Sequence, residues 1–295
     1  MTNDRSPVVL GVDASTSDQL LNWALDEARA RKVPLRLLHA FGGMMIYGSM
    51  SMYSDLGVPD LALVRATGEE LVAATADRAA ALAPDVELEV HAIDGDAVSV
   101  LLEEAKRAST IIVGARHLGV LGATVLGSVS NAVSARAACP VVVVLGPSGL
   151  PAESPAVVVG VDAGEDCEIP IAYAFEYASR HDLPIHAVLC WHPDLLATMS
   201  WRGEPAAPAR AEAWLSEALA GWREKYPSVP VHSAVVREHP VAGLVEASAA
   251  QHLLVVGTRG RHAFVGTLLG SVSQGVLHHG VCPVAVVPSP TAARG

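Results

Sequence analysis

The sequence predicts an α/β fold of two tandem, doubly wound, Rossmann-like domains, each built around a five-stranded parallel sheet. Three observations predict it. Val-rich runs alternate with Ala- and Leu-rich runs, the same motifs occur twice in the same order, and a Gly- and Pro-rich segment separates the two copies. Alternating strands and helices are typical of a parallel sheet that is covered on both faces. The length of 295 residues fits two ordinary domains.

The internal repeat sets the domain organisation. Residues 8–13 (VVLGVD) recur as residues 157–162 (VVVGVD), and residues 126–130 (LGSVS) recur unchanged as residues 269–273. Further matches in the same order join residues 34–41 with 184–191, 111–114 with 254–257, and 139–141 with 282–284. Matches in a fixed order indicate a duplicated unit, and Gly and Pro mark the connection between the copies. We therefore expect domain 1 at residues 1–146, a linker at residues 147–155 and domain 2 at residues 156–295.

Each half follows the same order of strands and helices. In half one we expect strands at residues 8–13, 35–41, 88–93, 110–114 and 141–145, with helices between them. The first helix is indicated by an apolar stripe at helical spacing, formed by Leu20, Leu21, Ala24, Leu25 and Ala28. Half two repeats the scheme, with strands near Val157, Ile185, Val231, Leu253 and Val284.

The last strand of each half, at residues 141–145 and 284–287, is short and Val-rich and is expected to form a sheet edge. Edges need cover because their backbone groups are otherwise unpaired. Pairing of the two last strands within one chain would supply this cover and join the domains. We also expect two chains to associate as a homodimer.

Composition and charge exclude several classes of protein. The formal net charge of −11 disfavours nucleic acid, which needs clustered Lys and Arg. No apolar run is long enough to cross a bilayer, so we expect no membrane association. Residues 1–7 are polar and lack the apolar core of a signal peptide, so we expect a cytoplasmic protein. The four cysteines form no CxxC pair, which gives no sign of a zinc or thioredoxin-like site.

Two kinds of candidate residue stand at predicted strand ends. Asp13 and Asp162 close the first strand of each half, and a glycine loop follows the fourth strand. In a doubly wound sheet, ligands bind outside the carboxyl ends of the strands, where the winding reverses. If the first and fourth strands are neighbours, the Asp and the loop meet at that crevice. An Asp suits ribose hydroxyls or a cation such as Mg²⁺ better than it suits a phosphate.

The glycine loop has the chemistry of a phosphate site. In half two it reads GTRG at residues 257–260, and GSVS follows nine residues later at residues 270–273. Glycines let the backbone approach phosphate oxygens closely and present N–H donors. The second segment opens a helix, whose free N–H groups and dipole suit an anion. Arg259 and Arg261 can neutralise phosphate charge.

This spacing of glycines resembles that of the ATP-binding members of the universal stress protein superfamily, which carry Gly-x-x-Gly, nine residues, then Gly-Ser or Gly-Thr. The resemblance covers both halves over nearly the whole chain, as in the tandem-domain members of actinobacteria. It implies ATP as the ligand, with or without Mg²⁺ near Asp13 and Asp162. We assign no catalytic residues, because no general base is evident for attack on a γ-phosphate.

The resemblance implies a role for each matched position. Asp13 and Asp162 contact the ribose or the metal, the backbone at Ala40 and Cys190 meets the adenine, and the loops hold the phosphates. In half one, the candidate contacts are Gly11, Val12, Asp13, Ala40, Gly114, Arg116, Gly127, Ser128, Val129 and Ser130. In half two, they are Gly160, Val161, Asp162, Cys190, Gly257, Arg259, Gly260, Gly270, Ser271, Val272 and Ser273.

Half one departs from this pattern, because His117 stands where the second glycine belongs. A histidine makes a positive φ or a close backbone approach harder than a glycine does. Gly119 and Gly122 offer another route for the loop. We therefore expect tighter ATP binding in half two than in half one.

Several alternatives stay open. The strand-end Asp residues can instead cap the helices that follow them, although Ser15 and Ser17 are also available in half one. The leading hypothesis for function is an ATP-dependent stress-response or signalling module. The second is a slow ATPase or phosphotransferase, against which stands the lack of a Gly-Lys-Ser/Thr phosphate loop. The third is an interaction protein that no longer holds nucleotide.

Overall fold

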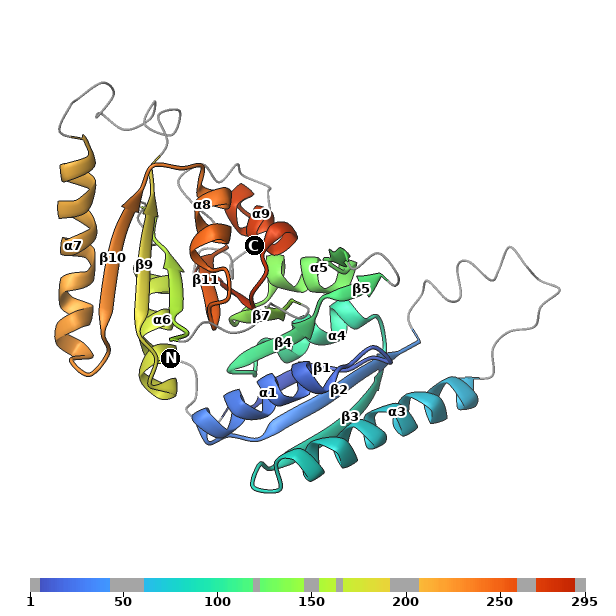
Figure 1. Cartoon of the computed structure of the whole chain (residues 1–295). Coiled ribbons are helices and arrows are strands. Elements are labelled where there is room, and N and C mark those ends of the chain that lie inside the picture. The colour runs from blue at the N-terminus through green and yellow to red at the C-terminus, as the bar shows by residue number, and fades with distance from the viewer. Residues whose placement is uncertain are drawn as a thin grey trace, which may run out of the picture. The chain divides into compact units, whose positions relative to one another are not determined.

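The computed structural model describes residues 6–42, 61–118, 123–145, 154–162, 167–191, 207–258 and 269–289 (Figure 1). The chain divides into two compact units. Unit 1 comprises residues 1–116 and 127–144, and unit 2 comprises residues 117–126 and 145–295. None of the helices in the described ranges combines the length and the apolar character needed to cross a bilayer.

The described part of unit 1 contains a parallel five-stranded sheet in the order β3-β2-β1-β4-β7. The strands are β1 (Val8–Gly11), β2 (Leu35–Phe41), β3 (Leu88–Asp94), β4 (Thr110–Gly114) and β7 (Val141–Val144). Strands β1, β4 and β7 read as continuous apolar runs, and their Val, Leu and Ile side chains are almost all buried. Such runs are expected of parallel strands that are covered on both faces.

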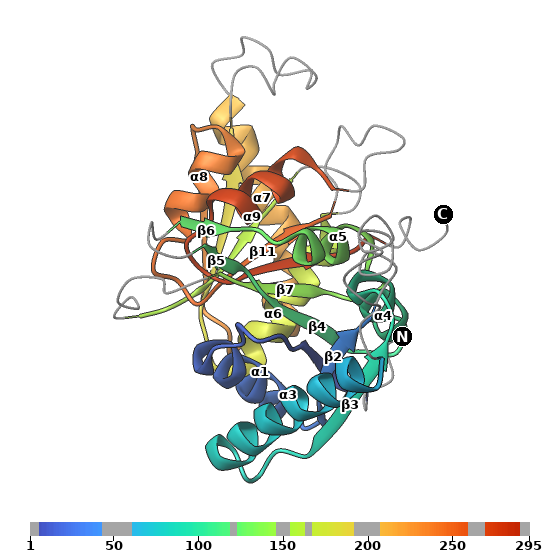
Figure 2. The same cartoon turned by 90° about the vertical axis from the view of Figure 1, so that its right-hand side faces the viewer.

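Helices cover both faces of this sheet. They are α1 (Asp18–Arg31), α3 (Leu61–Leu82), α4 (Ala97–Glu104) and α5 (Ser128–Arg136). The α3 helix packs on β2 through Gly68, from which an added Cβ would lie 3.0 Å from His39 and 3.2 Å from Phe41. The α4 helix covers the opposite face, where it reaches Arg36 of the same strand. The neighbouring helices α4 and α5 lie side by side (Figures 1 and 2).

Unit 2 repeats this architecture. Its parallel strands are β8 (Val157–Gly160), β9 (Ile185–Cys190), β10 (Val231–Val236), β11 (Leu253–Gly257) and β12 (Val284–Val287), in the order β10-β9-β8-β11-β12. Its helices are α6 (Glu168–His181), α7 (Ala207–Lys225), α8 (Pro240–Ala247) and α9 (Ser271–His279). Aromatic rings of α6 and α7 pack together at Phe175 and Trp222, whose centroids are 6.0 Å apart. Helices α8 and α9 pair as α4 and α5 do (Figure 2).

The predicted fold class is confirmed, with two differences. The first strand of each half ends at Gly11 or Gly160, although the backbone N–H of Val12 still donates to Leu38 across the ladder. In addition, the loop after β4 contains a short hairpin that we did not predict, formed by β5 (Arg116–Leu118) and β6 (Ala123–Val125). The predicted domain limits and the pairing of the two last strands stay predictions.

Candidate functional site

The two sheets place the first and fourth strands of each half next to each other, as predicted. β1 pairs with β4 from Val8↔Thr110, and β8 pairs with β11 from Leu253↔Val157. The chain leaves β1 toward β2 on one side and later returns to β4 on the other, so the winding reverses between these strands. This reversal leaves a crevice at the carboxyl ends of the two strands.

A helix begins beside each crevice with the same backbone geometry. Gly127 is the N-cap of α5 with φ −67° and ψ 152°, and Gly270 is the N-cap of α9 with φ −68° and ψ 153°. Neither N-terminus receives a side-chain capping bond. The first intrahelical bonds run from Asn131 N–H to Gly127 O (3.0 Å) and from Gln274 N–H to Gly270 O (2.9 Å). The N–H groups of the first three residues of each helix therefore have no acceptor within it.

The hydroxyl groups at these helix starts have two different environments. Ser128 and Ser271 are exposed first residues of their helices. Ser130 and Ser273 are buried and donate to strand-end carbonyls, at 2.9 Å to Gly114 O and 2.5 Å to Gly257 O. The hydroxyls of Ser130 and Ser273 thus tie each helix to its sheet. The backbone N–H groups and the exposed hydroxyls of Ser128 and Ser271 stay available to a ligand. The side chains of Val129 and Val272, between them, are half-buried.

Asp13 organises the turn after β1 and does not cap α1. Its Oδ1 accepts from the backbone N–H of Ser15 (2.8 Å) and from the Ser15 hydroxyl (2.6 Å). Ser17 is the N-cap of α1, and its hydroxyl accepts from Leu20 N–H at 3.2 Å. The capping alternative is therefore wrong for Asp13, whose carboxylate is exposed at the strand end. Asp162 is half-buried at the matching position, and residues 163–166 lie outside the described residues.

The ends of the second strands differ between the halves. Ala40 is half-buried on β2 and pairs with Ile93 of β3. In half two, Cys190 lies within 3.9 Å of the carbonyl of Pro240. Burial raises the pKa of the Cys190 thiol to about 11, so it is protonated at neutral pH and is a poor nucleophile.

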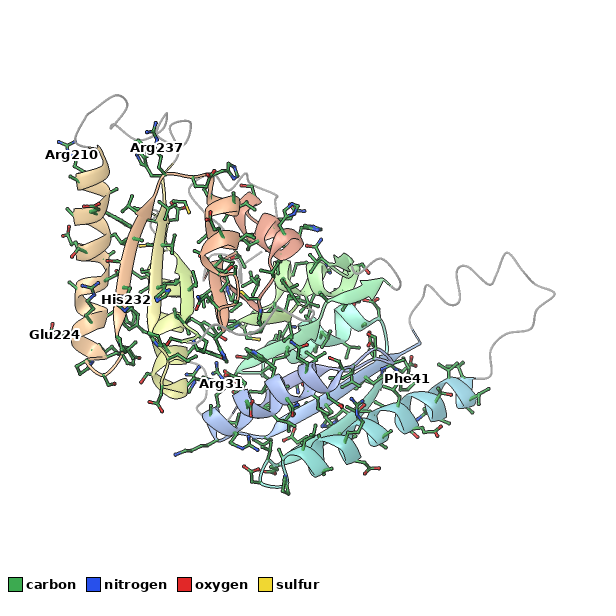
Figure 3. All side chains as sticks on the ribbon, in the orientation of Figure 1. Arg31, Phe41, Arg210, Glu224, His232 and Arg237 are labelled. Atoms are coloured by element: carbon green, nitrogen blue, oxygen red, sulfur yellow. The ribbon has the colours of Figure 1, made fainter. Side chains whose placement is uncertain are left out.

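Two further contacts lie beside the site, and the one in half two was not predicted from the sequence. His39 Nδ1 lies 2.8 Å from the carbonyl oxygen of Val12, and since a carbonyl only accepts, Nδ1 carries the proton. In half two, Arg237 follows the carboxyl end of β10 (Figure 3). Its guanidinium lies 5.1 Å from the ring centroid of Trp191. The Trp191 position matches Phe41 in the repeat, so an aromatic residue in both halves was a usable signal.

The remaining predicted contacts fall into three groups. Gly11 and Gly160 are strand residues packed against α4 and α8, and a Cβ on Gly160 would lie 2.9 Å from Leu244. Val12 and Val161 are buried and continue the strand pairing through their N–H groups. Arg259 and Gly260 lie outside the described residues, as do the side chains of Arg116 and His117 on β5.

Buried Thr258 also shapes the loop of half two. Its carbonyl accepts from Gly270 N–H at 2.7 Å, and its own N–H donates to the carbonyl of Val287 at 3.0 Å. The first bond holds the start of the glycine loop against its end, and the second holds it against β12. No pattern in the sequence predicts this role for Thr258.

Comparison with known proteins places the chain among universal stress proteins. The profile of the Universal stress protein family matches residues 5–144 and again residues 155–288. Universal stress proteins Rv2005c and Rv2623 of Mycobacterium tuberculosis (strain H37Rv) are 34% and 32% identical to the chain. The alignments cover 95% and 96% of this chain and 96% and 97% of those proteins. The crystal structure of a universal stress protein from Archaeoglobus fulgidus covers 96% of this chain and 98% of its own, with a TM-score of 0.61 at 18% identity.

Proposed function

The chain belongs to the universal stress protein family, and from that premise we propose that each half binds one ATP at the crevice beside its first and fourth strands. Nucleotide occupancy then biases the shape or the partners of the protein, so that the chain acts as a nucleotide-dependent stress-response module. Half two is the tighter of the two sites.

The observation that carries the proposal is the pair of uncapped helix N-termini at Gly127 and Gly270. Free N–H groups and the positive end of the helix dipole stabilise an anion at such a terminus. The exposed hydroxyls of Ser128 and Ser271 add a donor to each. Both helices start in the same backbone conformation and at the same place in the repeat. This recurrence favours a shared phosphate-binding role.

The rest of a nucleotide fits the other side of each crevice. Within the described residues, Asp13 Oδ1 is occupied by Ser15 whereas its Oδ2 makes no hydrogen bond, so it can accept from a ribose hydroxyl. Asp162 has the same place in half two. The strand ends at Ala40 and Cys190 border the position for the adenine. If Mg²⁺ accompanies the nucleotide, these two aspartates are the carboxylates that would hold it.

The test uses a double variant of the full chain, Ser128→Glu with Ser271→Glu, and Ser128→Gln with Ser271→Gln as its control. A glutamate in the first turn stabilises the helix and leaves the fold intact, but its carboxylate repels a phosphate. Calorimetric titration is expected to give two ATP per wild-type chain. The Glu variant should lose roughly 100-fold in affinity at each site, about 2.8 kcal/mol, while the Gln variant stays near wild type.

Other outcomes would replace the proposal. A wild-type protein whose melting temperature does not rise with ATP does not bind it, since a ligand of the native state must stabilise that state. The interaction-protein hypothesis would then stand. Steady release of phosphate from ATP, lost in the Ser271→Glu variant, would instead place the chain among ATPases or phosphotransferases.

A further inference from the structure

Two histidines of unit 2 lie directly opposite each other on neighbouring strands. His186 of β9 and His232 of β10 are partners in the parallel register, so their side chains emerge on the same face of the sheet. Their ring centroids are 5.4 Å apart and the ring planes meet at 83°. β10 is the outer strand of the unit's described sheet, and His232 is exposed on it (Figure 3). His186 is half-buried on β9.

The same positions in unit 1 hold opposite charges. Arg36 pairs in register with Glu89 of β3, as His186 pairs with His232. Arg36 donates to Glu89 at 2.6 Å and also to Glu104 at the end of α4. In unit 2, the residue that matches Glu104 in the repeat is Ala247. Equivalent positions thus hold an ion network in unit 1 and two imidazoles in unit 2, with no carboxylate in ion-pair contact with the imidazoles among the described residues.

The spacing of the two rings fits a shared metal ion. A zinc–imidazole bond is about 2.0–2.1 Å long, and two such ligands at a tetrahedral angle place their ring centroids about 5 Å apart. The separation of 5.4 Å is close to that value. Rotation about each metal–nitrogen bond leaves the angle between the ring planes free, so perpendicular rings are compatible with joint coordination.

We propose that His186 and His232 form a two-imidazole site for a divalent transition metal, with Zn²⁺, Cu²⁺ and Ni²⁺ as the class of ligand. Imidazole suits these metals, and Cu²⁺ binds most strongly in the general order of affinities. No cluster of three or more His, Cys, Asp or Glu suited to a metal occurs in the described part of the chain. Among the described residues, the two imidazoles are thus the ligands that the protein supplies, and water can occupy the other coordination positions.

This site is separate from the proposed nucleotide site. His186 and His232 are the second residues of their strands, near the amino ends, whereas the crevice lies at the carboxyl ends. In Figure 3, Arg237 marks the carboxyl end of β10 and His232 lies toward its other end. Metal binding can therefore fail or succeed independently of ATP binding.

The experiment titrates the full chain with Zn²⁺ in competition with a chromophoric chelator, under reducing conditions. The variants are His186→Gln and His232→Gln. His91→Gln, on β3 of unit 1, and the double substitution His278→Gln with His279→Gln serve as controls. Two linked ligands bind far more tightly than one, so each single site variant is expected to lose roughly 100-fold in affinity. The control variants should keep the wild-type affinity.

A spectroscopic measurement gives a second readout. Electron paramagnetic resonance of one equivalent of Cu²⁺ should show two coordinating imidazole nitrogens in the wild type and one in either variant. His232 is exposed, so His232→Gln keeps the test decidable even if His186→Gln perturbs the fold. Wild-type Zn²⁺ affinity in the His232→Gln variant, or the same loss in the His278→Gln, His279→Gln control, would overturn the proposal.

Discussion

The two halves of the chain share a scaffold, but they fill equivalent positions with different chemistry. Strand order and the Gly–Ser helix starts are the same in both. The halves differ in side chains on the sheets. Near the amino ends of the second and third strands, Arg36 and Glu89 of half one correspond to His186 and His232 of half two. The comparison shows which positions the fold requires and which the duplication left free to change.

The largest difference in stability between the halves should follow from removal of the ion network of half one. Arg36→Met leaves Glu89 and Glu104 without their cation in a partly buried site. Loss of one partner from a fully buried pair costs about 3–5 kcal/mol, and we expect about 2–3 kcal/mol here because the site is partly exposed. His186→Met, at the matching position, should cost less than about 1 kcal/mol.

Native-state hydrogen exchange, read separately for each half, is the measurement that compares these two variants. A similar loss of protection in Arg36→Met and His186→Met would show that the ion network has no special weight in half one.

A smaller effect is expected where α8 meets α9. A Cβ added to Gly275 would lie 2.5 Å from Val241, whose β-branched side chain is stiff, whereas half one holds Ala132 at this position. Gly275→Ala should destabilise half two by about 1–2 kcal/mol, because overpacking outweighs the gain in helix propensity.

The matched control is Gly221→Ala in α7, where an added Cβ meets nothing within 4 Å. It should stabilise half two by roughly 0.5–1 kcal/mol. Denaturant unfolding checks both signs, and a stabilising Gly275→Ala would mean that α8 and α9 pack no more closely than their counterparts.

The smallest expected effect is on the stability of half one at acidic pH. A hydrogen bond from Arg29 lowers the pKa of the exposed Asp85 from its ordinary value of 3.8 to about 2. A lowered pKa means that the pair contributes stability above pH 3.8 and loses it as the pH falls toward 2. Half two has Ser179 and Ser228 at these positions.

Asp85→Asn should therefore flatten the acid dependence of half one between about pH 4 and pH 2 and leave half two unchanged. Hydrogen exchange across that range measures it. An unchanged pH profile in the variant would show that this surface pair contributes nothing to stability.

Much of the scaffold was predictable from local patterns. Val- and Ile-rich runs such as residues 141–144 are typical of buried parallel strands, and the repeated GSVS segment marked both helix starts. The β5–β6 hairpin was predictable in principle, because two short runs flank residues 119–122, which contain two glycines. These residues read as part of the glycine loop, so no strand was predicted there.

The details of the site depend on contacts between distant residues, which a sequence does not display. Ser130 and Ser273 were expected to hold phosphates, but their hydroxyls bind the carbonyls of Gly114 and Gly257. Similarly, His186 and His232 meet only once the strand register is known. The residue types predicted which donors, acceptors and metal ligands the chain carries. The packing and the strand register determine which of these groups already bind one another in the folded protein.

The most direct test of the account is calorimetric titration of ATP into the two single variants. Ser128→Glu disables half one and reports the site of half two, whereas Ser271→Glu reports the site of half one. Half two keeps the complete glycine spacing, while half one carries His117 at the position of the second glycine. The account predicts tighter binding in Ser128→Glu than in Ser271→Glu. Equal affinities, or tighter binding in Ser271→Glu, would contradict it.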